Sequence, residues 1–434
     1  MAKILVTGDL GFMGSNLVRP ICARIKSSRE IRVSLVCRFP FGIQRWYTYL
    51  LAQALSRKGI FVKLYGPKSN LEECPYEKVW NWWSYPFDIV SKALKDRLNI
   101  VHIQFEFPTF RFFGALLLPL CLLLLKFARV KCVVTIHGPI LPLDKKAERI
   151  IREIMPDNYK QFPTKLVLRG LRLLYMLMEK IGARIIVHSH VFRKWLLGYG
   201  LRRVNVIYHG VNPPESSKRF LNEDASSIVC FGTISPRRGI EDFIMAIYMI
   251  RDYLISKNFN VIIAGRLAEY YTEYAALLSN LIDEIGLNGL VSMKYNVSDE
   301  EMDRLFEDAY IAVLPYKVSV SASGALSTAF EHGVPVLVAD TDYFREVLGP
   351  DFIGLFETGN SERLAEKLFM VLSNGETRKR ILEQMISKLS PYKWDIIASE
   401  TIKIYTDILR NHSIANFMKN LTNFLLRKRR RTNA

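Results

Sequence analysis

The chain has 434 residues, half of them hydrophobic, and carries a formal net charge of +18 at pH 7. A chain of this length and apolar content can bury a large core, and two domains are expected. The positive charge favours acidic partners such as nucleotide diphosphates and phospholipid headgroups, whereas nucleic acid is not expected because no aromatic platform accompanies the basic residues. The six cysteines show no C-x-x-C spacing, which argues against a zinc site or a disulfide framework and predicts buried thiols in a reducing compartment.

The chain begins with a predicted strand followed by Gly8, Gly11 and Gly14. This stretch resembles the dinucleotide fingerprint of short-chain dehydrogenases and nucleotide-sugar epimerases, in which glycines let the backbone approach a pyrophosphate. The resemblance covers only about the first twenty residues, because no Tyr-x-x-x-Lys pair follows and the next strand ends in Arg38 without the ribose-binding acid. We interpret residues 1–30 as a vestigial extension, with an NAD-dependent nucleotide-sugar epimerase as an alternative.

Residues 31–212 alternate apolar runs, typical of buried parallel strands, with segments whose apolar residues recur at helical spacing. Strands are predicted at residues 31–37, 61–65, 99–104, 132–136, 183–188 and 205–211, and helices at residues 46–58 and 166–178. This alternation predicts an α/β domain built on a parallel sheet. The fourteen residues from Phe112 to Leu125 carry no charge but fall short of the ~20 needed to span a bilayer. They predict a helix packed on the sheet, with contact with a membrane interface as the alternative.

His137 directly follows the predicted strand at residues 132–136. Ligands of a doubly wound sheet bind at the carboxyl ends of its strands, so we expect the His137 side chain in the ligand cleft. His102 lies inside a predicted strand instead, and is expected to be a core residue.

Residues 213–217 are rich in proline and serine and are interpreted as an interdomain linker. Beyond them, strands are predicted from residue 227 and at residues 261–264, 290–295, 311–315 and 335–339, and helices at residues 270–286, 299–308, 362–373, 376–390 and 394–410. The repeated alternation predicts a second parallel, doubly wound domain over residues 213–393.

The turn between the predicted strands 311–315 and 335–339 consists of small residues and precedes a short helix. Its central residues are Ser321, Ala322, Ser323, Gly324 and Ala325. Small side chains let a ligand approach the backbone, and the first N–H groups of a helix point outward at the positive end of its dipole. The turn is therefore predicted to bind a phosphate.

This turn, its helix and the following Gly333-Val-Pro-Val336 resemble the donor site of the family-4 glycosyltransferases, which are retaining enzymes of the GT-B fold. The resemblance spans about residues 31–410 and implies two doubly wound, Rossmann-like domains that face a cleft, with residues 394–411 crossing back to the first domain. The family shares the T-x-H-G sequence around His137, and its histidine contacts the donor sugar or the reacting centre. The same resemblance places Gly42, in the turn after the first strand, in the interdomain cleft near the donor diphosphate or the acceptor.

A second segment, Gly232 to Gly239, is similar to the family fingerprint G-R-x-x-x-x-K-G, whose two basic residues contact the donor diphosphate. Arg238 occupies the lysine position and Thr233 the arginine position, so one of the two cations is missing. Arg237 is a candidate to compensate, because a guanidinium suits bidentate contact with phosphate oxygens.

The family also carries two glutamates that bind the donor sugar and the nucleotide ribose, and this chain departs from that pattern. Val320 and Thr328 occupy the two positions. Glu331 lies one helical turn after Thr328 and is a candidate substitute. A catalytically silent GT-B module that binds a sugar nucleotide is therefore an alternative to an enzyme.

The resemblance implies a glycosyltransferase that moves a hexosyl group from a nucleotide-sugar donor to an acceptor hydroxyl with retention of configuration. Catalytic roles are expected for His137 and Arg238. Donor contacts are expected from Gly42, Thr233, Arg237, Arg238, Ser321, Ala322, Ser323, Gly324, Ala325, Thr328 and Glu331. No metal and no cofactor are expected, because arginine and a helix N-terminus can stabilise the charge of the leaving diphosphate.

Residues 412–434 are predicted to form an amphipathic basic tail. Apolar residues from Ile414 to Leu425 recur at helical spacing and run into the five cations Arg427 to Arg431. Such a segment binds an anionic membrane surface through its apolar face and its charge. We therefore predict a cytoplasmic protein, peripheral on the cytoplasmic face of a membrane, that glycosylates a lipid-linked or cell-surface glycan.

Overall fold

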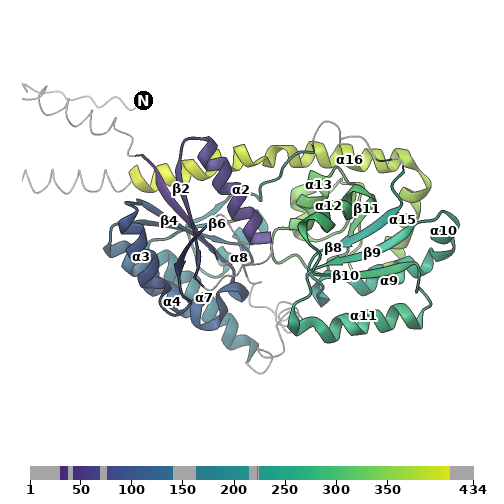
Figure 1. Ribbon diagram of the computed structural model, residues 1–434, viewed down its shortest axis with the longest axis horizontal. Helices are drawn as coiled ribbons and strands as arrows, with labels where there is room; N and C mark the ends of the chain where they lie inside the picture. The colour runs from purple at the N-terminus through teal and green to yellow at the C-terminus, as the bar shows by residue number, and fades with distance from the viewer. Residues whose placement is uncertain are drawn as a thin grey trace, which may run out of the picture.

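The computed structural model describes residues 30–37, 43–68, 76–139, 163–214, 222 and 224–410. It contains two parallel sheets, and the two α/β domains built on them lie side by side along the long axis of the molecule (Figure 1). Strand pairing in both sheets is parallel, with helices between most successive strands. The predicted architecture of two doubly wound domains is confirmed.

The first sheet has the strand order β3-β2-β1-β4-β5-β6-β7. Its strands are β1 Arg32–Val36, β2 Phe61–Pro67, β3 Glu77–Trp80, β4 Ile100–Phe105, β5 Lys131–Ile136, β6 Arg184–Val187 and β7 Val204–Val206. The labelled helices of this domain are α2 Ile43–Arg57, α3 Tyr85–Lys95, α4 Phe107–Phe127, α7 Thr164–Ile181 and α8 His190–Gly198. The strand order reverses between β1 and β4, so a ligand crevice is expected at the carboxyl ends of these strands.

Apolar layers cover both faces of the first sheet. On one face, α2 and a helix over residues 394–410 pack against Val33 and Leu35 of β1. On the other face, α3, α4 and α7 lie next to one another (Figure 1). All six residues of β4 are buried, as expected for a strand enclosed on both sides. His102 lies in this strand, between the hydroxyl oxygen of Tyr405 at 2.6 Å and that of Thr135 at 2.7 Å, so its predicted place in the core is confirmed.

The second sheet has the strand order β10-β9-β8-β11-β12-β13. Its strands are β8 Ser227–Phe231, β9 Asn260–Gly265, β10 Val291–Tyr295, β11 Ala309–Leu314, β12 Val336–Ala339 and β13 Leu355–Phe356. Its helices are η2 Pro236–Arg238, α9 Ile240–Met249, α10 Arg251–Ser256, η3 Glu269–Tyr271, α11 Thr272–Glu284, α12 Asp299–Glu307, α13 Gly324–Glu331, α14 Asp342–Leu348, α15 Ser361–Ser373, α16 Gly375–Leu389 and η4 Ser390–Tyr392. The order reverses between β8 and β11, which places the second crevice beside η2 and α13.

Two links join the domains within the described residues. The helix over residues 394–410, yellow in Figure 1, runs from the end of the second domain back to the first, where its Ile397 and Ile404 join the core. Glu346 of α14 accepts hydrogen bonds from the N–H groups of His190, at 2.7 Å, and Val191, at 2.9 Å. These groups begin α8, so a carboxylate of one domain caps a helix of the other, where the helix dipole favours negative charge.

Some elements differ from the sequence-based expectation. The segment between β2 and β4 contains β3 and α3, neither of which was predicted, and the short elements α14 and β13 were also missed. The predicted strand over residues 205–211 is wrong beyond Val206, where β7 ends, and Val211 forms an isolated bridge with Lys393 instead. The cysteines in the described residues, Cys37, Cys121, Cys132 and Cys230, are buried free thiols, as predicted.

Gly265, the last residue of β9, allows a close backbone approach. A methyl group at Gly265 would lie 1.7 Å from the carbonyl oxygen of Gly232, and its φ of +147° is rare for other residues. Gly265→Ala should therefore lower the free energy of unfolding by about 3 kcal/mol, because the clash is with backbone and cannot be relieved by a rotamer change.

Gly289 provides the matched control, because its φ of +85° is also positive but no atom lies within 4 Å of an added methyl group. Gly289→Ala should lower the free energy of unfolding by only about 1 kcal/mol, the cost of the backbone conformation alone. Denaturant unfolding of both variants measures the difference, and equal losses would show that the contact with Gly232 is unimportant.

Candidate active site

The carboxyl ends of the two sheets approach each other at Gly138, which lies just after β5. A methyl group built on Gly138 would lie 3.6 Å from the carbonyl oxygen of Val320 and 3.9 Å from Cβ of Ser321, both in the turn before α13. Because ligands of doubly wound sheets bind at the carboxyl ends of the strands, this junction between the domains is the candidate active site.

Arg238, at the end of η2, is a buried cation. Its side chain is 4% exposed, its Cζ lies 3.9 Å from the centroid of the Tyr316 ring, and its Nε and Nη1 have no hydrogen-bond partner among the described residues. Burial, and secondly the neighbouring Arg237, lower the pKa of this guanidinium well below its usual value. Burying a cation without an anionic partner costs free energy, so the position favours binding of an anion. These properties fit the predicted contact with a diphosphate.

The N-terminus of α13 is joined to Arg238 through Tyr316. The hydroxyl of Ser323 caps this helix by accepting a hydrogen bond from the N–H of Leu326, at 3.2 Å, and it lies 3.0 Å from the hydroxyl of Tyr316. The N–H groups of Gly324 and Ala325 have no acceptor among the described residues. Tyr316 therefore joins the two predicted phosphate-binding groups, because its ring stacks on the guanidinium and its hydroxyl contacts the helix cap.

His137 lies in the wall of the candidate site, and both of its ring nitrogens have partners. Its Nδ1 lies 3.2 Å from Nε2 of His188, and its Nε2 lies 2.9 Å from the side-chain amide oxygen of Gln104. The Nδ1 of His188 lies 2.9 Å from the carbonyl oxygen of Ile207, so this nitrogen must carry the proton. Burial is the main cause that lowers the pKa of both histidines, to about 3 for His188, so both rings are neutral.

Neutral rings fix the direction of the hydrogen bonds. The unprotonated Nε2 of His188 accepts from Nδ1–H of His137, which leaves Nε2 of His137 as an acceptor. The Gln104 amide must then present its NH₂ group to His137, and this orientation also gives Gln104 Nε2 the partner that it otherwise lacks. His137 is therefore held as a neutral residue beside Gly138, and its predicted role in the reaction stays a prediction.

Charged groups from both domains lie at the same junction. Glu106 directly follows β4, and its Oε1 lies 3.8 Å from the methyl group built on Gly138. Burial raises the pKa of Glu106, and the positive charges of Arg237 and Arg266 from the second domain oppose that rise. The sequence analysis missed Glu106 and Arg266, although each directly follows the carboxyl end of a strand, the same signal that identified the histidine.

Two predicted donor contacts point elsewhere. The hydroxyl of Thr328 donates to the carbonyl oxygen of Gly324 in its own helix, at 3.0 Å, and so replaces no carboxylate. Glu331 is exposed and accepts a hydrogen bond from the side-chain amide of Asn212, at 2.8 Å, next to the predicted linker. This contact turns Glu331 toward the linker, so the structure does not support its predicted role as a substitute donor ligand.

The remaining predicted site residues and segments have few described contacts or none. Thr233 lies between β8 and η2, where its carbonyl oxygen accepts a hydrogen bond of 3.5 Å from the Ser235 hydroxyl. Gly42, the glycine fingerprint in residues 1–29 and the tail over residues 411–434 lie outside the described residues.

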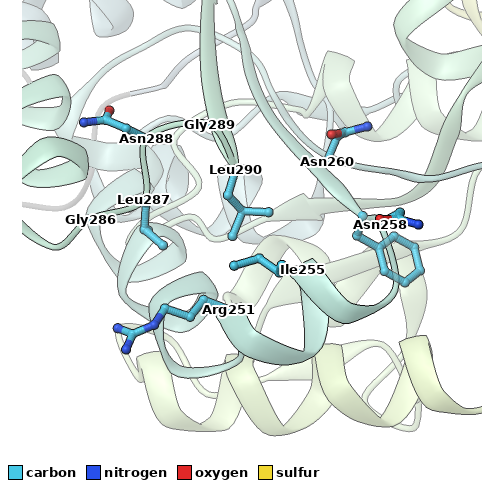
Figure 2. A pocket seen from close by; sticks show the side chains of 10 residues that line it. Arg251, Ile255, Asn258, Asn260, Gly286, Leu287, Asn288, Gly289 and Leu290 are labelled. Carbon is cyan, nitrogen blue, oxygen red and sulfur yellow. The ribbon is translucent and has the colours of Figure 1, made fainter.

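A cavity of about 400 Å³ lies away from this site, at the amino ends of two strands of the second sheet. Figure 2 shows Asn260, the first residue of β9, and Leu290, just before β10, in its lining. It is therefore at the amino ends of these strands and is not part of the candidate active site. Within the described ranges, no three metal-ligating side chains are grouped to hold a metal ion. Among the helices that the structure describes, none is long and apolar enough to cross a membrane.

Comparison with protein families assigns both halves of the chain. The model described as Glycosyltransferase Family 4 matches residues 44–215, and the model described as Glycosyl transferases group 1 matches residues 212–387. The first match spans β2 to β7, and the second spans β8 to β13 with Arg238 and α13.

Related proteins agree with this assignment. The O-antigen chain mannosyltransferase RfbU of Salmonella typhimurium is 27% identical over 231 residues, which are 52% of this chain and 60% of that relative. The chain thus spans about 60% of the length of this curated relative. Two solved structures share the fold: Anabaena HepE in complex with UDP-glucose (TM-score 0.65, 13% identity, 87% of this chain and 100% of that one) and the sucrose-phosphate synthase of Thermosynechococcus elongatus (TM-score 0.64, 14% identity, 88% and 100%). The chain therefore belongs to glycosyltransferase family 4 and has the GT-B fold.

Proposed function

We propose that this protein transfers a hexosyl group from a nucleotide-sugar donor to an acceptor hydroxyl with retention of configuration. The observation that carries the proposal is the buried guanidinium of Arg238, whose Nε and Nη1 lack partners among the described residues and which Tyr316 joins to the N-terminus of α13. Family membership supports retention as part of this proposal. A nucleotide-sugar donor is also supported by the UDP-glucose bound to the HepE neighbour.

The chemistry requires stabilisation of the negative charge that develops on the leaving diphosphate. Arg238 can donate from its unpartnered nitrogens, and the N–H groups of Gly324 and Ala325 can donate from the helix N-terminus. Donors that are already oriented toward the developing charge need no reorganisation, and loss of one such donor typically slows a reaction by about 10²–10³.

A donor panel tests this proposal. UDP-glucose, UDP-galactose, GDP-mannose and the free diphosphates are added to the full chain, and the melting temperature is followed, since a ligand that binds the folded state stabilises it by mass action. At least one nucleotide sugar should raise the melting temperature and release its diphosphate when an acceptor is present. Binding without turnover over a broad acceptor panel would favour the silent module suggested by Val320 and Thr328. Both matched families are glycosyltransferases, which does not favour the epimerase alternative.

We further propose that the acceptor is lipid-linked and that the protein binds the cytoplasmic face of an anionic membrane. The basic tail was the first candidate for this contact, and the apolar stretch in α4 was the second. One side of α4 is buried, but the other exposes apolar side chains, as do the neighbouring helices α3 and α7; we call these exposed apolar residues the leucine face. It comprises Phe87, Leu94, Leu116, Leu120, Leu123, Phe127, Leu166 and Leu173.

The charges around the leucine face suit an anionic surface. The exposed charged side chains described on the three helices are all basic: Lys95, Lys126, Lys165, Arg169, Arg172 and Lys180. Two acidic residues lie among them but are partly buried, and Glu179 accepts hydrogen bonds from the N–H groups of Arg202 and Arg203. Exposed apolar side chains bordered by cations are typical of proteins that bind an anionic interface.

Vesicle co-sedimentation of the full chain tests the membrane proposal. Phosphatidylglycerol vesicles should bind the protein, phosphatidylcholine vesicles should not, and salt should weaken the binding. The triple variant Leu116→Gln, Leu123→Gln, Phe127→Gln should bind less. The control variant Ile255→Gln, Leu277→Gln, Phe369→Gln changes equally exposed apolar residues of the second domain and should bind normally. If vesicle binding is lost only after deletion of residues 412–434, the tail makes the membrane contact. If all variants sediment equally with the vesicles, neither the leucine face nor the tail makes it.

A further inference from the structure

The donor pocket of this chain lacks a carboxylate in the place where its family has one. Val320 occupies the position of the first family glutamate, and Thr328, at the second, bonds to its own helix. A sugar hydroxyl is well bound by a carboxylate, because an ionised carboxylate accepts charge-assisted hydrogen bonds. A different residue of this chain must supply that contact if the donor sugar is to be held in the same way.

Glu106 of the first domain lies at the right place. Its Oε1, the carbonyl oxygen of Val320 and the Cβ of Ser321 all lie within 4 Å of a single point, the methyl position built on Gly138. Val320 and Ser321 belong to the turn that leads into the predicted phosphate-binding helix α13. The Glu106 carboxylate therefore lies near the turn in which the family's glutamate side chain would begin, on the other side of Gly138.

The charge around Glu106 fits a sugar contact better than a phosphate contact. Its positive neighbours Arg237 and Arg266 come from the second domain and favour its ionised form, whereas burial disfavours it. An ionised carboxylate repels a diphosphate, so it cannot be a phosphate ligand itself. It can accept hydrogen bonds from hydroxyl groups of a sugar that is attached to a diphosphate held by Arg238 and α13.

We propose that Glu106 binds a hydroxyl group of the sugar being transferred, and so supplies from the first domain the carboxylate that Val320 does not provide in the second. This proposal rests on the proposed function, because it assumes a nucleotide-sugar donor. It makes recognition of the sugar depend on closure of the two domains, since the diphosphate ligands lie on one domain and the sugar ligand on the other.

Calorimetry on the full chain tests the proposal by separating the sugar from the nucleotide. Affinities for UDP and UDP-glucose, and for GDP and GDP-mannose, are measured for the unchanged protein and for Glu106→Gln, which keeps the shape but removes the charge. For the nucleotide pair that binds, Glu106→Gln should lower the affinity for the sugar nucleotide about tenfold or more, which is the scale of a lost charged hydrogen bond. Affinity for the free diphosphate should stay the same or increase, because a nearby negative charge is removed.

Two further variants sharpen the comparison. Glu383→Gln changes an exposed carboxylate of α16 outside the site and should affect neither ligand. Glu331→Gln changes the rival carboxylate. The proposal would be overturned if this variant lost affinity for the sugar nucleotide alone while Glu106→Gln kept its affinity. Equal weakening of diphosphate and sugar nucleotide binding in Glu106→Gln, or an effect confined to the acceptor KM, would also overturn it. Failure of the unchanged protein to bind any of the four ligands would instead refute the proposed function itself.

Discussion

Arg238→Met should weaken binding of the donor diphosphate by about 10- to 150-fold, which corresponds to roughly 1.5–3 kcal/mol for a lost charged hydrogen bond. Turnover should fall by about 10²–10³ if the same group stabilises the leaving diphosphate. The melting temperature should stay the same or rise, because the substitution removes a buried cation whose Nε and Nη1 find no partner in the described part of the chain. Calorimetry and thermal unfolding measure the two effects.

Arg251 offers a matched control for this substitution. Its Cζ lies 4.4 Å from the centroid of the Tyr248 ring, so Arg251 also stacks on a tyrosine. Arg251 lines the cavity at the amino ends of β9 and β10, however, and not the candidate active site (Figure 2). Arg251→Met should leave diphosphate affinity unchanged. A lower melting temperature in Arg238→Met with unaltered diphosphate affinity would show that Arg238 has a structural role.

Stability should fall steeply between pH 7.5 and pH 5.5, because three buried histidines cannot be protonated in the folded state. His102, His137 and His188 are at most 7% exposed, and burial is the main cause that lowers their pKa, to about 3 for His102 and His188. The unfolded chain protonates at the ordinary value of 6.5, so it gains protons first and stability is lost as the pH falls from there toward the folded pKa. Burial also lowers the pKa of the half-buried His209, to about 4, so it belongs to the same group. Each of the four histidines contributes more than about 1 kcal/mol over this interval, and together they contribute about 5 kcal/mol.

Urea unfolding at a series of pH values measures this loss. His102→Gln keeps groups that can bond to Tyr405 and Thr135 but cannot be protonated in this range, so about one quarter of the loss should disappear. His190→Gln, at an exposed position, should leave the pH dependence unchanged. A free energy of unfolding that is flat from pH 7.5 to 5.5 would contradict the assignment of these residues as neutral and buried.

Much of the fold could be predicted because strands enclosed on both faces are continuous apolar runs. β4, β11 and β12 are almost entirely buried, and their nearly continuous apolar sequences predict this burial. The strands that were missed are short and lie at sheet edges: β3 has four residues and β13 has two. Such strands are fixed by pairing with a neighbour and show too few residues for a period to be read.

Some residues of the candidate site could also be predicted from the sequence, and others could not. Arg238 and the turn before α13 could be predicted, because their chemistry follows from residue type and position along the chain. Tyr316 could not, since its role depends on Arg238 and Ser323 approaching it from two sides. The direction of the Glu331 side chain could not be predicted either, because it accepts a hydrogen bond from Asn212, which tertiary packing brings to α13.

The helix over residues 394–410 has a consequence for synthesis on the ribosome. The first domain is translated first, but the apolar face of β1 is covered by Ile397, Ala398 and Tyr405, which are among the last described residues to emerge. The second domain has its strands and most of its helices complete by Leu389, so it can fold while the first still exposes this face. The domain that begins the chain is therefore the last to be finished, and a nascent chain stalled before residue 394 should present Val33 and Leu35 to chaperones.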